Sequence, residues 1–475
     1  MTFHYYKYKA SIWLILAPVL ILIFSCRKFV QIPAAPNTLV TSQIFADSAD
    51  ATAAVVGIYA EMNVGGYGYT LGNGAVSFYP ALSSDELVPI TGSSDENEFY
   101  SDAVSPVDNG PLESVFWESA YELIYQANAC IQGLSASTGL SADLQNQLIG
   151  ESKLIRAIIY FNMVNLIGPV PLETTTNYQV NETMARTSTD SVYAQITADL
   201  LDAQARLSTS YVSPGKARPN VYSATALLSK VYLYQQKWDS AEIEATKIIS
   251  SGMYSLVPDP NNVFLTGSTE AIWQILSVNQ GYETSEGYQL VPTATNVEPN
   301  YIINPYLLNA FEPNDLRWSA WLDSNVVNGQ TYYYPYKYKL GYDGWPTGGP
   351  TEAYMVFRLG EQYLIRAEAE AQQGQLTAAI TDLNIIRTRA SLPNTGASGQ
   401  PAVLAAIQHE RQVELFCEWG NRWMDLKRWG TVASVLGAPG NEKTGMWPAD
   451  NHAALYPIPF TELQYNSFLV QNPGY

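Results

Sequence analysis

The chain has 475 residues, of which 47% are hydrophobic and 15% are charged, so it can bury a large core and is not a disordered protein. It carries 25 Lys and Arg against 44 Asp and Glu, and the resulting net charge of −19 repels nucleic-acid phosphates and anionic lipid headgroups. We therefore expect no nucleic-acid partner.

The first 25 residues have the pattern of a secretory signal. Lys7 and Lys9 form a positive start, and 13 apolar residues run from Ile12 to Phe24, "IWLILAPVLILIF". This run is shorter than the roughly 20 helical residues that span a bilayer. Because Ser25 precedes Cys26, as at a bacterial lipoprotein processing site, we predict a signal peptide over 1–25 and lipidation of Cys26. The alternative is an ordinary signal peptide with a chance cysteine.

The three cysteines are Cys26, Cys130 and Cys417, which is too few for a disulfide framework in an exported chain. We interpret Cys130 and Cys417 as buried structural thiols that do not form a pair.

Residues 26–40 are predicted to be an extended tether, because their prolines and lack of periodicity do not suit a packed element. One domain over 41–475 follows. Its apolar residues recur at helical spacing over about 41–62, 113–251 and 353–430. The predicted fold class is mainly α. Separate helices are expected over 113–134, 143–167, 188–207, 220–235, 238–251, 353–373, 376–391 and 402–429.

Two segments of this body resemble copies of one unit. Residues 227–249 lie over residues 364–386 without gaps, which places Leu227 on Leu364, Ala241 on Ala378 and Ile248 on Ile385. The pattern is that of a tetratricopeptide repeat, in which two antiparallel helices stack on neighbouring pairs. We therefore predict a scaffold of helical hairpins.

Two regions interrupt the helical pattern. Residues 63–112 are rich in Gly, Ser and Pro, and residues 252–350 form a long irregular insertion. Within it, the span 282–345 contains 14 aromatic residues among 64, including "TYYYPYKYKLGYDGW". Long irregular segments in a compact protein are normally functional, and aromatic rings stack on the C–H faces of sugar rings. We expect the ligand site in these two regions.

Catalytic and metal-binding motifs are scarce. Beyond the predicted signal the chain has His409 and His452, with no HExxH or CxxC motif beside them, so we predict no metal site and no cofactor. Paired carboxylates remain open as a glycosidase alternative, because such pairs need no sequence motif. The candidates are the acidic residues of "SSDELV" and "SSDENEF": Asp85, Glu86, Asp95, Glu96 and Glu98. Their other interpretation is solvated loop charge or helix capping.

Several stretches in order resemble the SusD/RagB nutrient-uptake lipoproteins of Bacteroidetes-type outer membranes. They include "GESKLIRAIIYFNMVNLIGPVPL", "FRLGEQYLIRAEAEAQQGQLTAAITDLNIIRTRASLP", "ERQVELFCEWGNRWMDLKRWG" and the ending "YPIPFTELQYNSFLVQNPGY". The resemblance implies a tetratricopeptide-like body and a lipid-anchored position on the outer membrane, facing the exterior. It also implies capture of a glycan or a peptide without catalysis and delivery to a SusC-like TonB-dependent barrel. A repeat scaffold that binds only proteins is the other alternative beside the glycosidase. A structural Ca²⁺ occurs within the family, but no motif here places one. Arg27 and Lys28 depart from the acidic residues that often follow the lipid cysteine.

The family's ligand-binding aromatics lie in loops of variable length, so candidates are chosen here by position. They are Tyr67, Tyr69, Phe99, Tyr100, Tyr282, Tyr288, Tyr301, Trp321 and Trp345, with Asp85 as a structural or polar neighbour. Trp318 is expected to serve packing.

The tryptophan-rich segment "CEWGNRWMDLKRWG" belongs to the resemblance's C-terminal signature rather than to its ligand loops. We therefore predict an internal brace, with Trp423 buried, instead of a ligand cage. Spacing along a helix would pair Arg411 with Glu414, Glu418 with Arg422 and Arg422 with Asp425, with a break at Gly420.

Overall fold

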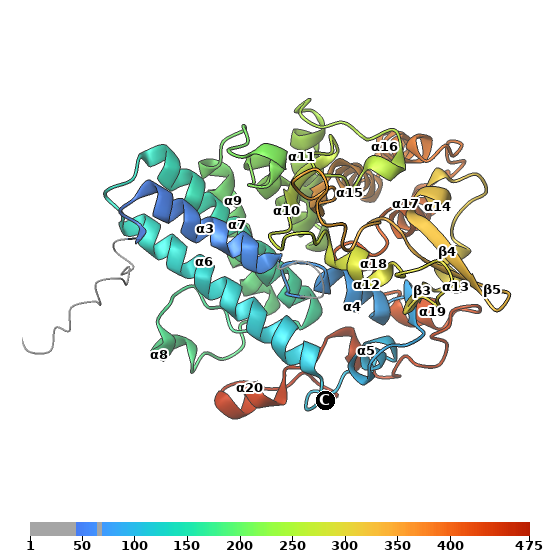
Figure 1. Cartoon of the computed structure of the whole chain (residues 1–475), viewed down its shortest axis with the longest axis horizontal. Helices are drawn as coiled ribbons and strands as arrows, with labels where there is room; N and C mark the ends of the chain where they lie inside the picture. Colours follow the sequence, from blue (N-terminus) through green and yellow to red (C-terminus); the bar gives the residue numbers. More distant parts are fainter. Residues whose placement is uncertain (1–43, 64–68) are drawn as a thin grey trace, which may run out of the picture.

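A computed structural model describes residues 44–63 and 69–475. The predicted signal peptide, the tether, Cys26 and Tyr67 lie outside the described residues. Helices dominate the described chain, as predicted, and its strands form three two-stranded sheets (Figure 1).

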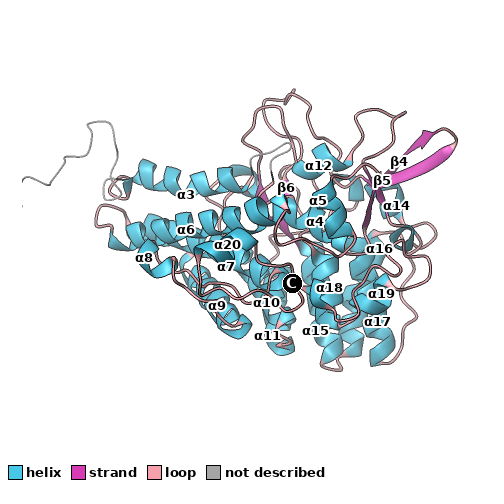
Figure 2. Cartoon of the chain, turned by 90° about the horizontal axis from the view of Figure 1, so that it is seen from below, coloured by secondary structure: helices cyan, strands magenta, loops and turns pink. Residues whose placement is uncertain are grey.

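The body is a row of long helices, most of them packed against the next one along the chain (Figure 1, Figure 2). Helix α3 lies against α6 and α7 at one end, and α17 lies against α15 and α16 at the other. The helices of this body are α3 (Ser48–Met62), η1 (Leu112–Glu118), α6 (Ser119–Ala136), α7 (Ala142–Leu166), α9 (Thr189–Arg206), α10 (Val221–Tyr234), α11 (Trp238–Ile249), α15 (Leu359–Gln372), α16 (Leu376–Arg389) and α17 (Gln400–Glu414).

Polar side chains begin several of these helices. The Asp47 carboxylate accepts from the N–H groups of Ala49 and Asp50 at the start of α3. Ser141 and Ser188 cap α7 and α9 in the same way. Each cap satisfies N–H groups that have no partner in the first helical turn.

The two predicted hairpins are α10 with α11 and α15 with α16. The alignment of residues 227–249 with 364–386 was wrong by one residue, because the turns of the two hairpins match only when the second segment is shifted by one. Gln235 and Gln373 both end the first helix, and Ala241 corresponds in burial to Ala379 rather than to the half-buried Ala378. Both alanines fit the helical period, so periodicity alone does not fix the register.

The two regions predicted to be irregular contain short elements. The first holds α4 (Ala75–Ser83), β1 (Leu87–Pro89) and α5 (Ser94–Tyr100). The second holds η3 (Pro260–Asn262), β2 (Ala271–Ile275), α12 (Ser285–Leu290), β3 (Tyr301–Ile303), α13 (Pro305–Leu308), α14 (Leu316–Trp321), β4 (Leu322–Val327) and β5 (Gln330–Pro335). The remaining elements outside the helical row are α8 (Tyr178–Asn181), η2 (Pro214–Lys216), β6 (Tyr354–Arg358), α18 (Asn421–Trp429), α19 (Val432–Leu436), η4 (His452–Ala454) and α20 (Phe460–Tyr465).

Strand β6 corrects the prediction of a helix over 353–373. It pairs antiparallel with β2, Trp273 lies opposite Phe357, and every residue of both strands is buried. A strand buried on both faces shows no alternation of polar and apolar residues, so its sequence resembles the start of a buried helix. The other sheets pair β1 with β3 and β4 with β5, also antiparallel.

The predicted helix over 402–429 is two helices, α17 and α18, separated by a turn. Cys417, Trp419 and Gly420 have positive φ angles of 52°, 48° and 61° in this turn. A Cβ atom on Gly420 would lie 3.0 Å from the carbonyl oxygen of Val76, which shows how closely the turn approaches α4. Trp423 is 0% exposed, so the predicted burial of this residue is confirmed.

The ion pairs expected along that segment were wrong. Arg411 binds Asp425 at 2.7 Å, and Arg422 binds Asp85 at 2.7 Å. Glu418 binds Arg358 at 2.7 Å. The turn at 415–420 separates Glu418 from Arg422, but the other two expected pairs each lie within one helix, α17 or α18. There, partners from other elements replace the expected ones, and Asp425 pairs along α18 with Arg428 instead.

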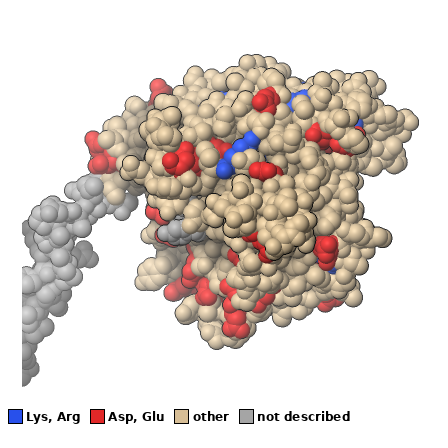
Figure 3. Space-filling model, turned by 45° about the vertical axis from the view of Figure 1, so that its right-hand side comes forward, with Lys and Arg blue, Asp and Glu red and all other residues tan. Residues whose placement is uncertain are grey.

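The two cysteines of the described chain and the charge on its surface agree with the expectations from sequence. Cys130 and Cys417 are free and buried, as predicted. On the face drawn in Figure 3, Asp and Glu are more numerous than Lys and Arg. Among the helices at 44–63 and 69–475, none combines the length and the apolar character that a membrane crossing needs.

Candidate functional site

Four aromatic side chains of the long insertion come together at the surface: Tyr282, Tyr288, Tyr342 and Trp345. We call them the insertion cluster. The Tyr282 ring lies 5.0 Å from the Tyr342 ring and 5.9 Å from the Tyr288 ring, measured between centroids. The Trp345 indole N–H donates to the carbonyl oxygen of Tyr282 at 3.0 Å. Two segments separated by about sixty residues therefore form one aromatic surface.

Backbone hydrogen bonds hold the two segments together. Tyr282 and Tyr342 form an antiparallel bridge, and the N–H of Glu283 donates to the carbonyl oxygen of Gly341 at 3.0 Å. The N–H of Asp343 donates to the carbonyl oxygen of Gly281, also at 3.0 Å. The cluster thus rests on paired backbone rather than on side-chain contacts alone.

Glycines permit this close approach. A Cβ atom on Gly341 would lie 2.6 Å from the Cα atom of Tyr288, and one on Gly281 would lie 2.6 Å from the Tyr342 ring. Gly281 also has a φ angle of 87°, which other residues rarely adopt. The glycines between the tyrosines are therefore part of the geometry of the cluster.

Two carboxylates accept hydrogen bonds from the backbone of the segment 339–352, which carries Tyr342 and Trp345. Glu283 accepts from the N–H groups of Thr351 and Glu352 at 3.1 and 2.8 Å. The Glu352 carboxylate accepts in turn from the N–H groups of Lys339 and Leu340. Burial raises the pKa of Glu352 to about 7. These contacts fix both ends of the segment that carries Tyr342 and Trp345.

The rings of the cluster are accessible to a ligand. Tyr342 is 63% exposed and Tyr288 is 40% exposed, while Tyr282 and Trp345 are half-buried. Tyrosine and tryptophan present a flat apolar face with a polar edge, which suits a sugar ring whose C–H patch is bordered by hydroxyl groups. The arrangement can therefore bind a carbohydrate by stacking.

Three other predicted ligand residues pack around α4: Phe99 and Tyr301 are buried, and Tyr69 is half-buried. Tyr69 stacks on Phe78 at 5.5 Å, and Tyr301 meets the same ring edge-on at 4.8 Å. Phe99 is 0% exposed and contacts Tyr79 at 4.7 Å. Burial also raises the pKa of Tyr69 well above its usual range. Phe99 and Tyr301 therefore belong to an aromatic core with Phe78 and Tyr79 of α4 and offer no free face to a ligand, whereas Tyr69 packs against that core and stays half-buried.

The remaining candidates are separate from the insertion cluster. Trp321 is 0% exposed, donates its indole N–H to the carbonyl oxygen of Pro260 at 2.9 Å and lies 4.5 Å from Lys337 Nζ. Its prediction as a ligand residue does not agree with this burial. Tyr100 is half-buried and lies 5.5 Å from Lys443 Nζ.

Tyr342 was not among the predicted ligand residues, although it is the most exposed ring of the insertion cluster. The available signal was its flanking glycines, Gly341 and Gly344, within the tyrosine-rich stretch. Trp318, expected to serve packing, contacts Phe311 and Tyr333 at 5.6 and 5.4 Å.

The acidic residues of the glycosidase alternative have structural partners. Asp85 is buried in its pair with Arg422, and Glu86 accepts from the N–H of Cys417 at 3.2 Å. Burial, with a contribution from Asp85, raises the pKa of Glu86 to about 8. Glu96 completes the capping box of α5. Within residues 44–63 and 69–475, no grouping of His, Cys, Asp and Glu has the arrangement of a metal site.

Two family models match the chain. The one described as the SusD family matches residues 312–475, and the one described as "Starch-binding associating with outer membrane" matches residues 72–233. A SusD-like protein of Formosa agariphila is 25% identical to this chain and the match covers 95% of this chain and 97% of that protein.

Solved structures share the fold. A "Laminarin binding SusD-like protein" is 26% identical, with a TM-score of 0.75 over 90% of this chain and 99% of that one. A SusD superfamily protein from Bacteroides vulgatus is 23% identical, also with a TM-score of 0.75, over 91% of this chain and 100% of that one. The similarity to the Bacteroides vulgatus structure concerns the fold alone.

Proposed function

We propose that this chain, which belongs to the SusD-like family, binds an oligosaccharide at the insertion cluster and delivers it to a SusC-like transport barrel without chemical conversion. The observation that carries the proposal is the surface formed by Tyr282, Tyr288, Tyr342 and Trp345, with two of its rings more than one-third exposed. The laminarin-binding relative supports a carbohydrate as the ligand class.

The rings would bind the sugar through its apolar face. Each stacked ring would contribute about 1 kcal/mol beyond the area it buries, by analogy with aromatic pairs. Binding therefore requires several rings on one surface, and the cluster supplies them. The nearby carboxylates of Glu283 and Glu352 are occupied by backbone N–H groups, which supports a binding role rather than acid–base chemistry.

Lipid attachment at Cys26 would hold this domain at the outer membrane, with its binding surface toward the exterior. Replacing Cys26 with Ala should move the protein from the membrane fraction to the soluble fraction. Persistence of the variant in the membrane fraction would refute the lipid anchor.

A glycan array with the protein from residue 27 onward tests the binding proposal. We expect a set of related oligosaccharides to bind and to be recovered intact after prolonged incubation. Appearance of shorter products would support the glycosidase alternative instead. Absence of any glycan binding, with a peptide bound, would assign the cluster to peptide capture and overturn the carbohydrate proposal. Co-purification of the full-length protein with a barrel tests the delivery step separately.

A further inference from the structure

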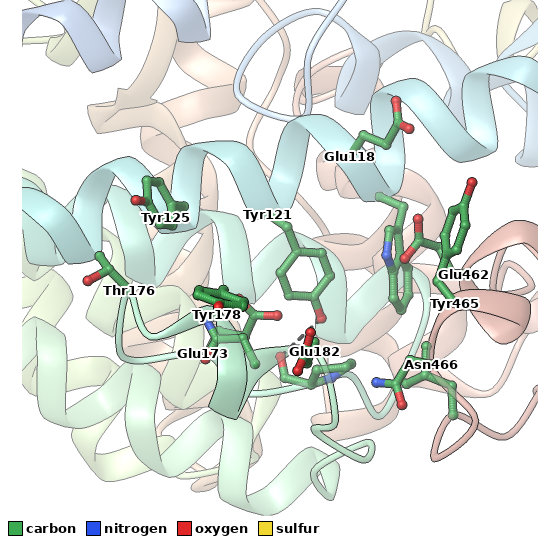
Figure 4. Close-up of a pocket in the computed structure, with 14 residues that line it drawn as sticks. Glu118, Tyr121, Tyr125, Glu173, Thr176, Tyr178, Glu182, Glu462, Tyr465 and Asn466 are labelled. Carbon is green, nitrogen blue, oxygen red and sulfur yellow. Dashed lines mark hydrogen bonds between the residues drawn. The ribbon is translucent and has the colours of Figure 1, made fainter.

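A groove of about 520 Å³ lies between α6, the segment around α8, and α20 (Figure 4). Figure 1 and Figure 2 place α8 and α20 apart from α12, which carries part of the insertion cluster. The groove shares no residue with that cluster, and the proposed function does not use it. Its volume is within the range of roughly 300–1,000 Å³ that small-molecule sites occupy.

Aromatic rings from three segments line the groove. Trp117, Tyr121 and Tyr125 follow one another at intervals of four residues, so they share one face of η1 and α6. The Trp117 and Tyr121 rings lie 5.1 Å apart, and the Tyr121 hydroxyl donates to the carbonyl oxygen of Pro171 at 3.0 Å. Tyr178 and Tyr465 are 69% and 82% exposed, so their rings remain accessible.

Four carboxylates share this groove: Glu118, Glu173, Glu182 and Glu462. Figure 4 shows Glu173 and Tyr178 on one side of Tyr121, and Glu462 and Tyr465 on the other. Among the described residues that line the groove there is no Lys, Arg or His. The groove therefore combines π faces with an excess of negative charge.

The neighbouring arginine does not neutralise this charge by direct pairing. Arg186 donates to the carbonyl oxygens of Pro169 and Val470, the latter at 2.8 Å, and to Asn472. Burial, and then the neighbouring Glu462, raises the pKa of Glu173 to about 7. Burial also raises the pKa of Glu462, with Glu118 and Glu113 adding to it. A bound cation would relieve this repulsion.

We propose that the groove binds a small organic cation that carries an alkylammonium group. Ionised carboxylates only accept hydrogen bonds, so the ligand must supply donors. A neutral sugar also supplies donors, but an ammonium group adds the positive charge that strengthens its hydrogen bonds to carboxylates. An ammonium group over tyrosine or tryptophan faces gains cation–π attraction, and its alkyl part covers the apolar rings.

The test compares cyclohexylammonium with cyclohexanol, a neutral molecule of nearly the same shape, by titration at pH 8 and low salt. We expect the ammonium compound to bind at least tenfold more tightly, and the difference to shrink as salt screens the carboxylates. Equal binding of the two compounds, or absence of ammonium binding, would overturn the proposal.

Matched variants locate the binding. Glu182→Gln and Tyr178→Ala alter exposed groove residues and should each weaken ammonium binding at least fivefold. Glu61→Gln makes the same charge change at an exposed position on α3, and Tyr342→Ala removes an exposed ring of the insertion cluster. Both controls should leave ammonium binding unchanged. An equal loss in the controls would indicate attraction to the acidic protein as a whole and refute the site. Glycan binding by the insertion cluster is measured separately, so either proposal can fail alone.

Discussion

Replacing Trp423 with Ala tests whether the tryptophan-rich segment is a brace. The side chain is 0% exposed, its ring meets Trp447 edge-on at 5.8 Å, and Lys427 Nζ lies 5.3 Å from the ring centre. Removing a fully buried indole takes away its transfer free energy and leaves a cavity. We expect a loss of about 3 to 5 kcal/mol in the free energy of unfolding.

Chemical denaturation monitored by circular dichroism measures this loss, and glycan titration below the unfolding transition measures function. The folded variant should retain glycan affinity within about twofold, since the residue lies in α18 and not in the insertion cluster. Trp318→Ala is the control, because Trp318 is 36% exposed and should cost much less stability. A stable Trp423→Ala variant that no longer binds glycan would refute the brace.

Three further changes test the fold and the support of the site. Burial raises the pKa of Glu286 to about 8, so the folded state holds more protons than the unfolded state from about pH 4.5 to 8, and stability falls as pH rises through that window. The unfolding temperature of Glu286→Gln minus that of the wild type should therefore be larger at pH 8 than at pH 5. The same difference at both pH values would contradict this. Arg422→Leu should cost about 3–5 kcal/mol because it leaves Asp85 buried and unpaired, whereas the double change to Leu at both positions should recover much of that loss in the same denaturation assay. Gly341→Ala should weaken glycan binding, because its Cβ would meet Tyr288 at 2.6 Å, while thermal unfolding of the body changes little; unchanged affinity would show that the cluster tolerates the shift.

The helices of the body could be predicted from the sequence because their apolar residues repeat at the helical period and each helix packs on its neighbours along the chain. The same property left the repeat register ambiguous, since Ala378 and Ala379 both suit a tight crossing. Strand β6 was missed for a related reason. Its residues from Tyr354 to Arg358 are buried on both faces and show no alternation.

The ion pairs and the ligand residues depended on tertiary contacts that spacing does not encode. Arg422 pairs with Asp85, which lies far away in the sequence, although Asp425 lies three residues further along the same helix. Aromatic density pointed to the insertion that holds the insertion cluster, but tyrosine serves both cores and surfaces. Tyr301 therefore packs inside, while Tyr342, from the same region, lies outside.

The affinity of Tyr342→Ala for the strongest glycan from the array tests whether the insertion cluster binds the glycan. Tyr465→Ala, at an 82% exposed tyrosine outside the insertion cluster, is the matched control. We expect at least a fivefold loss of glycan affinity for Tyr342→Ala, with unchanged unfolding temperature, and no loss for Tyr465→Ala. Full glycan affinity in Tyr342→Ala, or an equal loss in both variants, would contradict the assignment of the insertion cluster as the glycan-binding surface.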